Sequence, residues 1–289
     1  PVRRPARSVG DAVCVLNQVS TGQGRERLDK VSLSLNAGEI VAIAGVSGNG
    51  QVALAELLCG TRAASAGEVI FLGQPLPQHP AELVGLGVAR IPEDRHAVGV
   101  VGDLPVWENA VSERLRSPAF STWGWVRRAQ ARLYAKKVME AFDVRGGGPL
   151  VAARSLSGGN MQKLILGRAL MHPASVATNH TTPRLIIAHQ PTWGLDIGAV
   201  AYVQSQLIAA RDAGAAVLLI SDDLDEVLTL GDRVAVMHAG EMTAAKPALD
   251  WSREAIGLAM AGVAHTAHAS SAADAFAMET QTTSTKVSV

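Results

Sequence analysis

The chain reads Leu156-Ser157-Gly158-Gly159-Asn160-Met161-Gln162 at a point where a helix is predicted to begin. The apolar residues that follow recur at three- and four-residue spacing, which predicts an amphipathic helix: Met161, Leu164, Ile165 and Ala169. Ser157 is a residue type that caps helix N-termini with its hydroxyl. Free backbone N–H groups at the positive end of a helix dipole bind anions, and glycines let a phosphate approach them closely. The stretch therefore predicts a helix start that contacts phosphate.

The composition limits which classes of protein the chain can belong to. Lys and Arg together number 26, as do Asp and Glu, so no nucleic-acid partner is expected. Cys14 and Cys59 lie in apolar surroundings, which favours reduced core thiols over a disulfide. The longest apolar runs are strand-sized and no signal peptide is visible, so we expect no direct membrane insertion. Any role at a membrane is therefore expected to act through a partner.

Apolar runs and composition divide the chain into three parts. Residues 1–11 read as a Pro/Arg/Ala linker, and the start without methionine suggests a fragment of a longer protein. Residues 12–262 are expected to form one domain, with a mostly helical lobe at about 95–172. Residues 263–289 are rich in Ala, Ser, Thr and His, which predicts a disordered tail. Buried strands alternate with helices, which predicts an α/β fold with a mainly parallel sheet covered on both faces: 40–44, 185–188, 216–220 and 234–237.

A glycine-rich loop follows the first buried strand and precedes a predicted helix over 51–58. Its glycines have the spacing of the phosphate-binding pattern G-x-x-x-x-G-K-[ST], but Gln51 replaces the lysine and Val52 replaces the hydroxyl residue that ligates Mg²⁺. Backbone N–H groups of such a loop can still cradle phosphate. The candidate nucleotide-binding residues are Gly45, Ser47, Gly48, Asn49, Gly50, Gln51 and Val52. The alternative is an ordinary strand-to-helix turn that binds nothing.

Together, the loop and the helix start resemble the phosphate loop and signature motif of ATP-binding cassette (ABC) proteins. This resemblance implies a P-loop nucleotide-binding fold with an antiparallel β subdomain and an inserted helical lobe. Some importers of simple sugars and nucleosides carry two cassettes in one chain, and they have a segment similar to Pro92-Glu93-Asp94-Arg95. The altered phosphate loop of this chain resembles the phosphate loop of their C-terminal cassette. Residues 174–183 form an insertion of about ten residues relative to the family, between the signature helix and the strand that follows it.

The same resemblance assigns roles to altered positions. Pro191, Thr192 and Asp196 fix the register of a D-E-P-T…L-D segment, with Asp196 in the D-loop. His189 and Gln190 then stand where the family has the Mg²⁺-organising aspartate and the general-base glutamate. Asp222 stands at the histidine of the H-loop, and Glu93 at the glutamine of the Q-loop. The catalytic candidates are therefore Gln190, Asp222 and Glu93, and no metal ligand is assigned.

One hypothesis pairs His189 with Asp222 across neighbouring strands, as compensating changes. The alternative is that Asp222 only begins a solvated acidic helix start that extends to Glu226. A hydrogen bond between the two side chains would support the pairing, and its absence would reject it.

In this family two cassettes meet head to tail, so each signature motif completes the ATP site of the other cassette. The residues expected to contact the partner's ATP are Ser157, Gly158, Gly159, Asn160 and Gln162. The resemblance implies ATP as ligand, with Mg²⁺ mainly at the partner's site, and little ATPase activity of this chain alone. It implies two kinds of partner, which are another cassette earlier in the same polypeptide and transmembrane permease subunits. The expected location is the cytoplasmic face of the plasma membrane.

Three other readings remain open at the level of sequence. The chain could be a structural or regulatory cassette that binds no nucleotide. It could be an ABC protein of translation or DNA repair, although the basic extensions and long coiled coils typical of those proteins do not occur here. A phosphotransferase with a phosphate loop is disfavoured by Gln51 and by the signature helix.

Overall fold

The computed structural model describes residues 6, 8–24, 26–173 and 182–262. Most of the predicted linker and of the 174–183 insertion, and the whole 263–289 tail, lie outside the described residues. Cys14 and Cys59 are free thiols, as predicted, and burial raises the pKa of each to about 12.

The main sheet has five parallel strands, which confirms the α/β prediction. Its order is β11 (Arg233–His238), β3 (Ile40–Ala44), β10 (Ala216–Ser221), β9 (Leu185–His189) and β6 (Val88–Ile91). Two short strands, β12 (Glu241–Met242) and β13 (Lys246–Pro247), pair antiparallel to β11 at one edge. Continuous apolar runs such as Ile40–Ala44 are buried on both faces, as parallel strands require.

Successive side chains of β3 enter two separate hydrophobic cores. Ile40 and Ala42 pack with the helices on one face, whereas Val41 and Ile43 pack beneath the second sheet. This second sheet is antiparallel and has the order β2 (Val31–Asn36), β1 (Ala12–Ser20), β4 (Ala66–Phe71) and β5 (Gln74–Pro75). Together with α1 (Gln51–Leu58) it covers the second face. It corresponds to the antiparallel subdomain that the resemblance implies.

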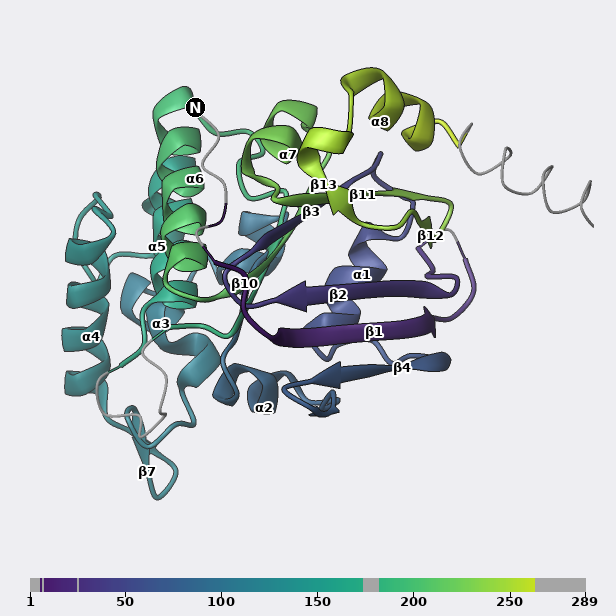
Figure 1. Cartoon of the computed structure of the whole chain (residues 1–289). Helices are drawn as coiled ribbons and strands as arrows, with labels where there is room; N and C mark the ends of the chain where they lie inside the picture. The colour runs from purple at the N-terminus through teal and green to yellow at the C-terminus, as the bar shows by residue number, and fades with distance from the viewer. Residues whose placement is uncertain (1–5, 7, 25, 174–181, 263–289) are drawn as a thin grey trace, which may run out of the picture.

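The helical lobe lies to one side of the two sheets (Figure 1). It contains α3 (Val106–Val111), α4 (Arg128–Ala141) and α5 (Gly158–Leu170), and it is entered through a short π-helix over Arg95–Gly99. A hairpin of β7 (Ser121–Thr122) and β8 (Trp125–Val126), which the sequence did not predict, projects from its lower end. The remaining α-helices are α2 (Pro80–Gly85), α6 (Ile197–Asp212), α7 (Leu224–Leu230) and α8 (Arg253–Met260).

Gly167 lets α5 and α4 approach closely. A Cβ atom at this position would lie 2.5 Å from Cγ1 of Val138 and 3.1 Å from Cδ2 of Phe142. We therefore expect Gly167→Ala to lower the free energy of unfolding by about 1–3 kcal/mol through overpacking, measured by urea denaturation. Gly257→Ala is the matched control, because nothing lies within 4 Å of its added Cβ and alanine favours helix. Equal effects of the two substitutions would contradict this account of the α4–α5 contact.

Candidate nucleotide site

The glycine-rich loop after β3 is closed by the side chain of Gln51. Its Nε2 donates to the carbonyl of Val46 at 2.8 Å, and its Oε1 accepts from the backbone N–H of Asn49 at 2.9 Å. A Cβ at Gly45 would lie 2.8 Å from the backbone carbonyl oxygen of Met237 and 2.4 Å from Nε2 of Gln51, so glycine is required there. Gln51 is only 3% exposed. The amide therefore folds under the loop, and it binds one of the backbone donors that could otherwise face a phosphate.

Asn49 fastens the same loop to the segment after β11. Its Nδ2 donates to the carbonyl of Val46 at 2.7 Å, and its Oδ1 accepts from the N–H of Ala239 at 2.8 Å. The backbone carbonyl of Asn49 accepts from Gly240 at 2.9 Å. The side chains of Asn49 and Gln51 thus brace the loop through hydrogen bonds to its own backbone and to Ala239.

A cavity of about 600 Å³ opens beside this loop. It is lined by Gly24, Arg27, Ser47, Gly48, Asn49 and Ala239. Arg27 gives the cavity a guanidinium beside a loop that lacks its lysine, and guanidinium groups bind phosphate oxygens well. Sequence reasoning missed Arg27, because it lies in a connection between β1 and β2 that carries no periodic pattern. The residues that can hold phosphate here are Arg27 and the backbone of residues 47–50.

His189 does not pair with Asp222, so the hypothesis of compensating partners is wrong. Among the described residues no hydrogen bond or ion pair joins their side chains; instead Nε2 of His189 lies 3.6 Å from Oε2 of Glu93. His189 is the last residue of β9 and Asp222 directly follows β10, but the imidazole lies beside Glu93, which follows β6. Burial lowers the pKa of His189, against the opposing effect of Glu26 and Asp222. The imidazole is therefore neutral near pH 7 and gives no charge to a phosphate.

Several carboxyl groups lie near His189 and Glu93 at this edge of the sheet. Burial, together with the nearby charges of Asp222 and Asp94, raises the pKa of Glu93. Glu26, which the sequence reasoning also missed, acts electrostatically on His189 from a third loop. Within residues 6, 8–24, 26–173 and 182–262 no group of three or more His, Cys, Asp and Glu side chains has the arrangement of a metal site. Val52 and His189 supply neither the hydroxyl nor the carboxylate that Mg²⁺ prefers.

Gln190 follows β9 in a left-handed conformation with φ 47°. Its N–H donates to the carbonyl of Ile220 at 2.8 Å, and its side-chain Oε1 accepts from the N–H of Asp222 at 3.4 Å. The residue is 6% exposed. Its amide thus joins the ends of β9 and β10, and an amide cannot accept a proton from water at neutral pH.

The signature helix begins as the sequence predicts. Ser157 is the N-cap of α5, and its Oγ accepts from the backbone and side-chain N–H groups of Asn160 at 3.4 and 2.9 Å. The N–H groups of Gly158 and Gly159 are in the first turn and have no acceptor within the helix. Asp196 caps α6 by accepting from Ala199 at 2.9 Å.

Gln162 lies differently from the other signature residues. It is 2% exposed, and its Nε2 donates to the carbonyl of Pro191 at 2.7 Å. Its side chain therefore joins α5 to the loop after β9 rather than facing solvent. Arg95 adds a second link, since its guanidinium donates to the carbonyls of Trp193 and Gly194 at 2.9 and 3.3 Å.

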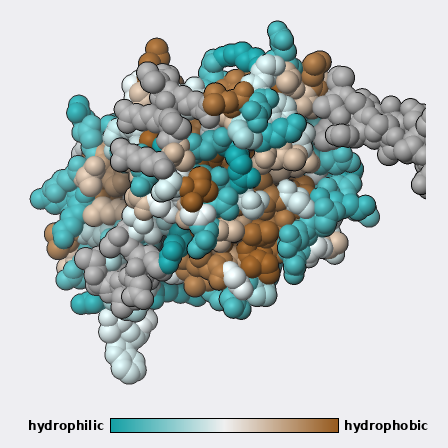
Figure 2. Space-filling view, in the orientation of Figure 1, coloured by the Kyte–Doolittle hydropathy of each residue, from teal (hydrophilic) through white to brown (hydrophobic). Residues whose placement is uncertain are grey.

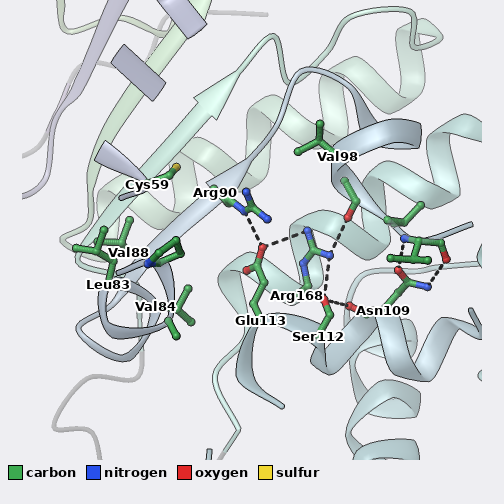
Figure 3. Close-up of a pocket in the computed structure, with 15 residues that line it drawn as sticks. Cys59, Leu83, Val84, Val88, Arg90, Val98, Asn109, Ser112, Glu113 and Arg168 are labelled. Carbon is green, nitrogen blue, oxygen red and sulfur yellow. Dashed lines mark hydrogen bonds and ion pairs between the residues drawn. The ribbon is translucent and has the colours of Figure 1, made fainter. Parts of the chain in front are cut away.

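A second cavity of about 400 Å³ lies between α2, β6 and the lobe. Figure 3 shows Arg90 and Arg168 converging on the carboxylate of Glu113, at 3.0 and 3.4 Å. Burial raises the pKa of Glu113, but Arg168 and Arg90 lower it by more, so the carboxylate stays ionised. These ion pairs fasten the lobe to the strand that leads to Glu93.

Comparison with known proteins decides the family. The profile described as ABC transporter matches residues 28–178. The chain belongs to the ABC transporter family. A solved ATP-binding cassette of an ABC transporter in its ADP conformation has a TM-score of 0.65 and 25% identity, over 87% of this chain and 95% of that one. A nucleotide-free cassette has a TM-score of 0.65 and 24% identity, over 82% and 92%. The fold of this cassette is therefore the ABC ATPase fold.

Among curated relatives, this cassette is 39% identical to the glucose import ATP-binding protein TsgD13 of Haloferax volcanii, over 90% of this chain and 47% of that protein. It is 37% identical to the nucleoside import ATP-binding protein NupA of Lactococcus lactis, over 84% and 47%. The guanosine import ATP-binding protein NupO of Bacillus subtilis is 38% identical, over 84% and 46%. The chain thus spans about half the length of these relatives. No helix in the described part of the cassette is long and apolar enough to cross a membrane.

Glu226 is a buried carboxyl group close to the candidate site, and its protonation is expected to affect stability. It is 2% exposed, its Oε1 accepts from Thr192 at 2.9 Å, and its Oε2 is one of the buried atoms in the described residues without a hydrogen-bond partner. Burial raises the pKa of Glu226 above 4.5. The protonated form is therefore favoured by folding, and stability is lost as the pH rises from 4.5 through the raised pKa.

We expect Glu226→Gln to remove this loss and to raise the free energy of unfolding at neutral pH by about 1–3 kcal/mol. The advantage over wild type should shrink as the pH falls toward 4.5, measured by urea denaturation across this range. Glu140→Gln is the control, since the Glu140 side chain is 66% exposed. A destabilised Glu226→Gln variant at neutral pH would show that the ionised carboxylate is favoured instead.

Proposed function

We propose that this cassette is one half of an ATP-driven importer of sugars or nucleosides, in which it completes the ATP site of a second cassette. The main support is an asymmetry in the structure. The helix start at Ser157–Gly159 keeps unpaired N–H donors, whereas the cassette's own phosphate loop is filled by the amide of Gln51. A phosphate can therefore bind more readily at the helix start than at the cassette's own phosphate loop.

The cassette's own site lacks the groups that cleave ATP. Val52 has no hydroxyl for Mg²⁺, His189 replaces a carboxylate, and Gln190 cannot act as a general base. Asp222 and Glu93 add negative charge where a terminal phosphate would lie. ATP, when bound at the composite site, carries the reactive phosphoanhydride. The signature N–H groups of this chain would stabilise its charge, while the second cassette supplies Mg²⁺ ligands and base.

The similarity to import ATP-binding proteins supports sugars or nucleosides as the transported substrates. This chain matches only about half the length of those relatives, which supports a second cassette in the same polypeptide. Transmembrane permease subunits are the proposed coupling partners, and the proposed location is the cytoplasmic face of the membrane. Glu93 and the lobe behind it would transmit closure, because Arg90, Glu113 and Arg168 fasten that strand to the lobe.

A structural cassette that binds no nucleotide is the second candidate. The hydrogen bonds of Gln51 and Asn49 favour it, since they stabilise the loop without ligand. The cation of Arg27 beside the open cavity favours weak binding instead.

Substitutions at the loop distinguish these candidates. We expect the wild-type chain to bind ATP weakly. The affinity for ATP should fall on the order of tenfold in Arg27→Ala, which removes a charged contact to phosphate, and rise on the order of tenfold or more in Gln51→Lys, which adds one. Calorimetric titration with ATP measures both. Arg116→Ala removes an exposed arginine far from the cavity lining and should leave the affinity unchanged. If neither wild type nor Gln51→Lys binds ATP, the structural cassette is the better description.

The signature assignment is tested in the full transporter. Ser157→Ala removes an N-cap and, by our proposal, a contact to the second cassette's ATP, so transport-coupled ATP turnover should fall at least tenfold. Ser252→Ala is the matched control, because Ser252 caps α8 in the same way by accepting from Ala255 at 3.0 Å. Both variants should lose about 1 kcal/mol of stability. Equal turnover in the two variants would reject the composite site.

A further inference from the structure

The β7–β8 hairpin displays two tryptophans to solvent. Trp123 is 96% exposed and Trp125 is 81% exposed, on a hairpin that projects from the lobe (Figure 1). Figure 2 shows this projection as a pale finger that stands clear of the rest of the surface. In the described part of the chain no ring contact, cation–π contact or side-chain hydrogen bond involves either tryptophan. The two side chains therefore contribute nothing visible to folding.

Two other tryptophans of the cassette serve the fold. Trp107 is 6% exposed and lies under the guanidinium of Arg132, and Trp251 donates to the carbonyl of Val234 at 3.0 Å. The hairpin tryptophans thus differ in kind from these two. Large apolar side chains held fully in water are typical of interaction sites.

The backbone at the tip makes tryptophan an unfavourable choice there. Trp123 and Gly124 are the two central residues of the turn, with φ 53° and 82°. Two-residue turns with positive φ at both positions favour Asn-Gly, and bulky residues rarely adopt this conformation. Because Trp123 is both strained and exposed, we infer that it serves an interaction with a partner and not the stability of the fold.

Positive charge is concentrated around the hairpin. The chain as a whole has a formal net charge of zero. Between residues 114 and 139, however, seven basic residues occur and no acidic one: Arg114, Arg116, Arg127, Arg128, Arg132, Lys136 and Lys137. All of these except Arg114 are exposed, and Arg127 and Arg128 directly follow β8. The hairpin therefore offers aromatic rings at its tip and cations behind them.

We propose that the β7–β8 hairpin is a contact with the surface of an anionic lipid bilayer. Tryptophan favours the headgroup layer of bilayers, where its ring is half-desolvated. Basic side chains near an anionic leaflet add attraction that decays within a Debye length. The cations extend from the tip along α4, which matches an extended anionic surface better than a narrow protein pocket. The contact lies in the headgroup layer and needs no membrane-spanning segment.

Sedimentation with lipid vesicles tests this contact on the chain alone, independently of the nucleotide sites. We expect the wild type to sediment with vesicles that contain phosphatidylglycerol and to remain free with phosphatidylcholine vesicles. Trp123→Ala with Trp125→Ala should lower the partition coefficient on the order of tenfold or more. Arg127→Glu with Arg128→Glu should lower it by a similar factor, and added salt should weaken the wild-type contact.

Two further variants separate lipid binding from folding. Trp123→Asn suits the turn, so it should fold at least as stably as wild type by thermal denaturation while its vesicle binding falls. Trp193→Ala removes a tryptophan that is 63% exposed elsewhere on the surface and should bind vesicles like wild type. The proposal would be overturned if the wild-type protein did not sediment with anionic vesicles. It would also be overturned if the Trp123→Ala/Trp125→Ala variant bound them as tightly as the wild type.

Discussion

The parallel register of β3, β9 and β10 is the constraint on which the candidate site depends. Ser221 lies opposite Ala44, and Ile220 lies opposite His189, so the three strands end at nearly the same level. The loops that follow them are consequently brought to one edge of the sheet, as in other open α/β sheets.

This convergence explains why the altered residues form one set. Where a lysine, a hydroxyl and a metal-binding carboxylate would bind a charged triphosphate, this chain has Gln51, Val52 and His189. The amide of Gln51 satisfies the loop from within, and the neutral imidazole of His189 lies beside Glu93. Burial, together with the nearby charges of Asp222 and Asp94, raises the pKa of Glu93 at the same edge.

The sequence predicted features that are encoded locally, and it failed where distant loops meet. The strand over 40–44 and the helix over 51–58 were predicted with the bounds that the structure shows, because apolar runs and glycine spacing act within a few residues. The cap by Ser157 was also confirmed. The partner of His189, the inward side chain of Gln162 and the position of Arg27 depend on tertiary packing that no periodicity encodes. The β7–β8 hairpin was missed because Trp-Gly is a weak turn signal compared with Asn-Gly.

The two ends of the candidate site are mechanically joined within this one chain. Gln162 connects the signature helix to Pro191, and Arg95 connects the segment after Glu93 to Trp193 and Gly194. Both contacts end on the loop after β9, whose Gln190 in turn holds the N–H of Asp222. A phosphate bound at Ser157–Gly159 would therefore act on a helix that is hydrogen-bonded to the loop after β9. The Gln162–Pro191 hydrogen bond is buried, so a shift of α5 would be transmitted to this loop, whereas the contacts of Arg95 are exposed. In the proposed function, these contacts are the route by which a neighbour's nucleotide would act on the altered site of this cassette.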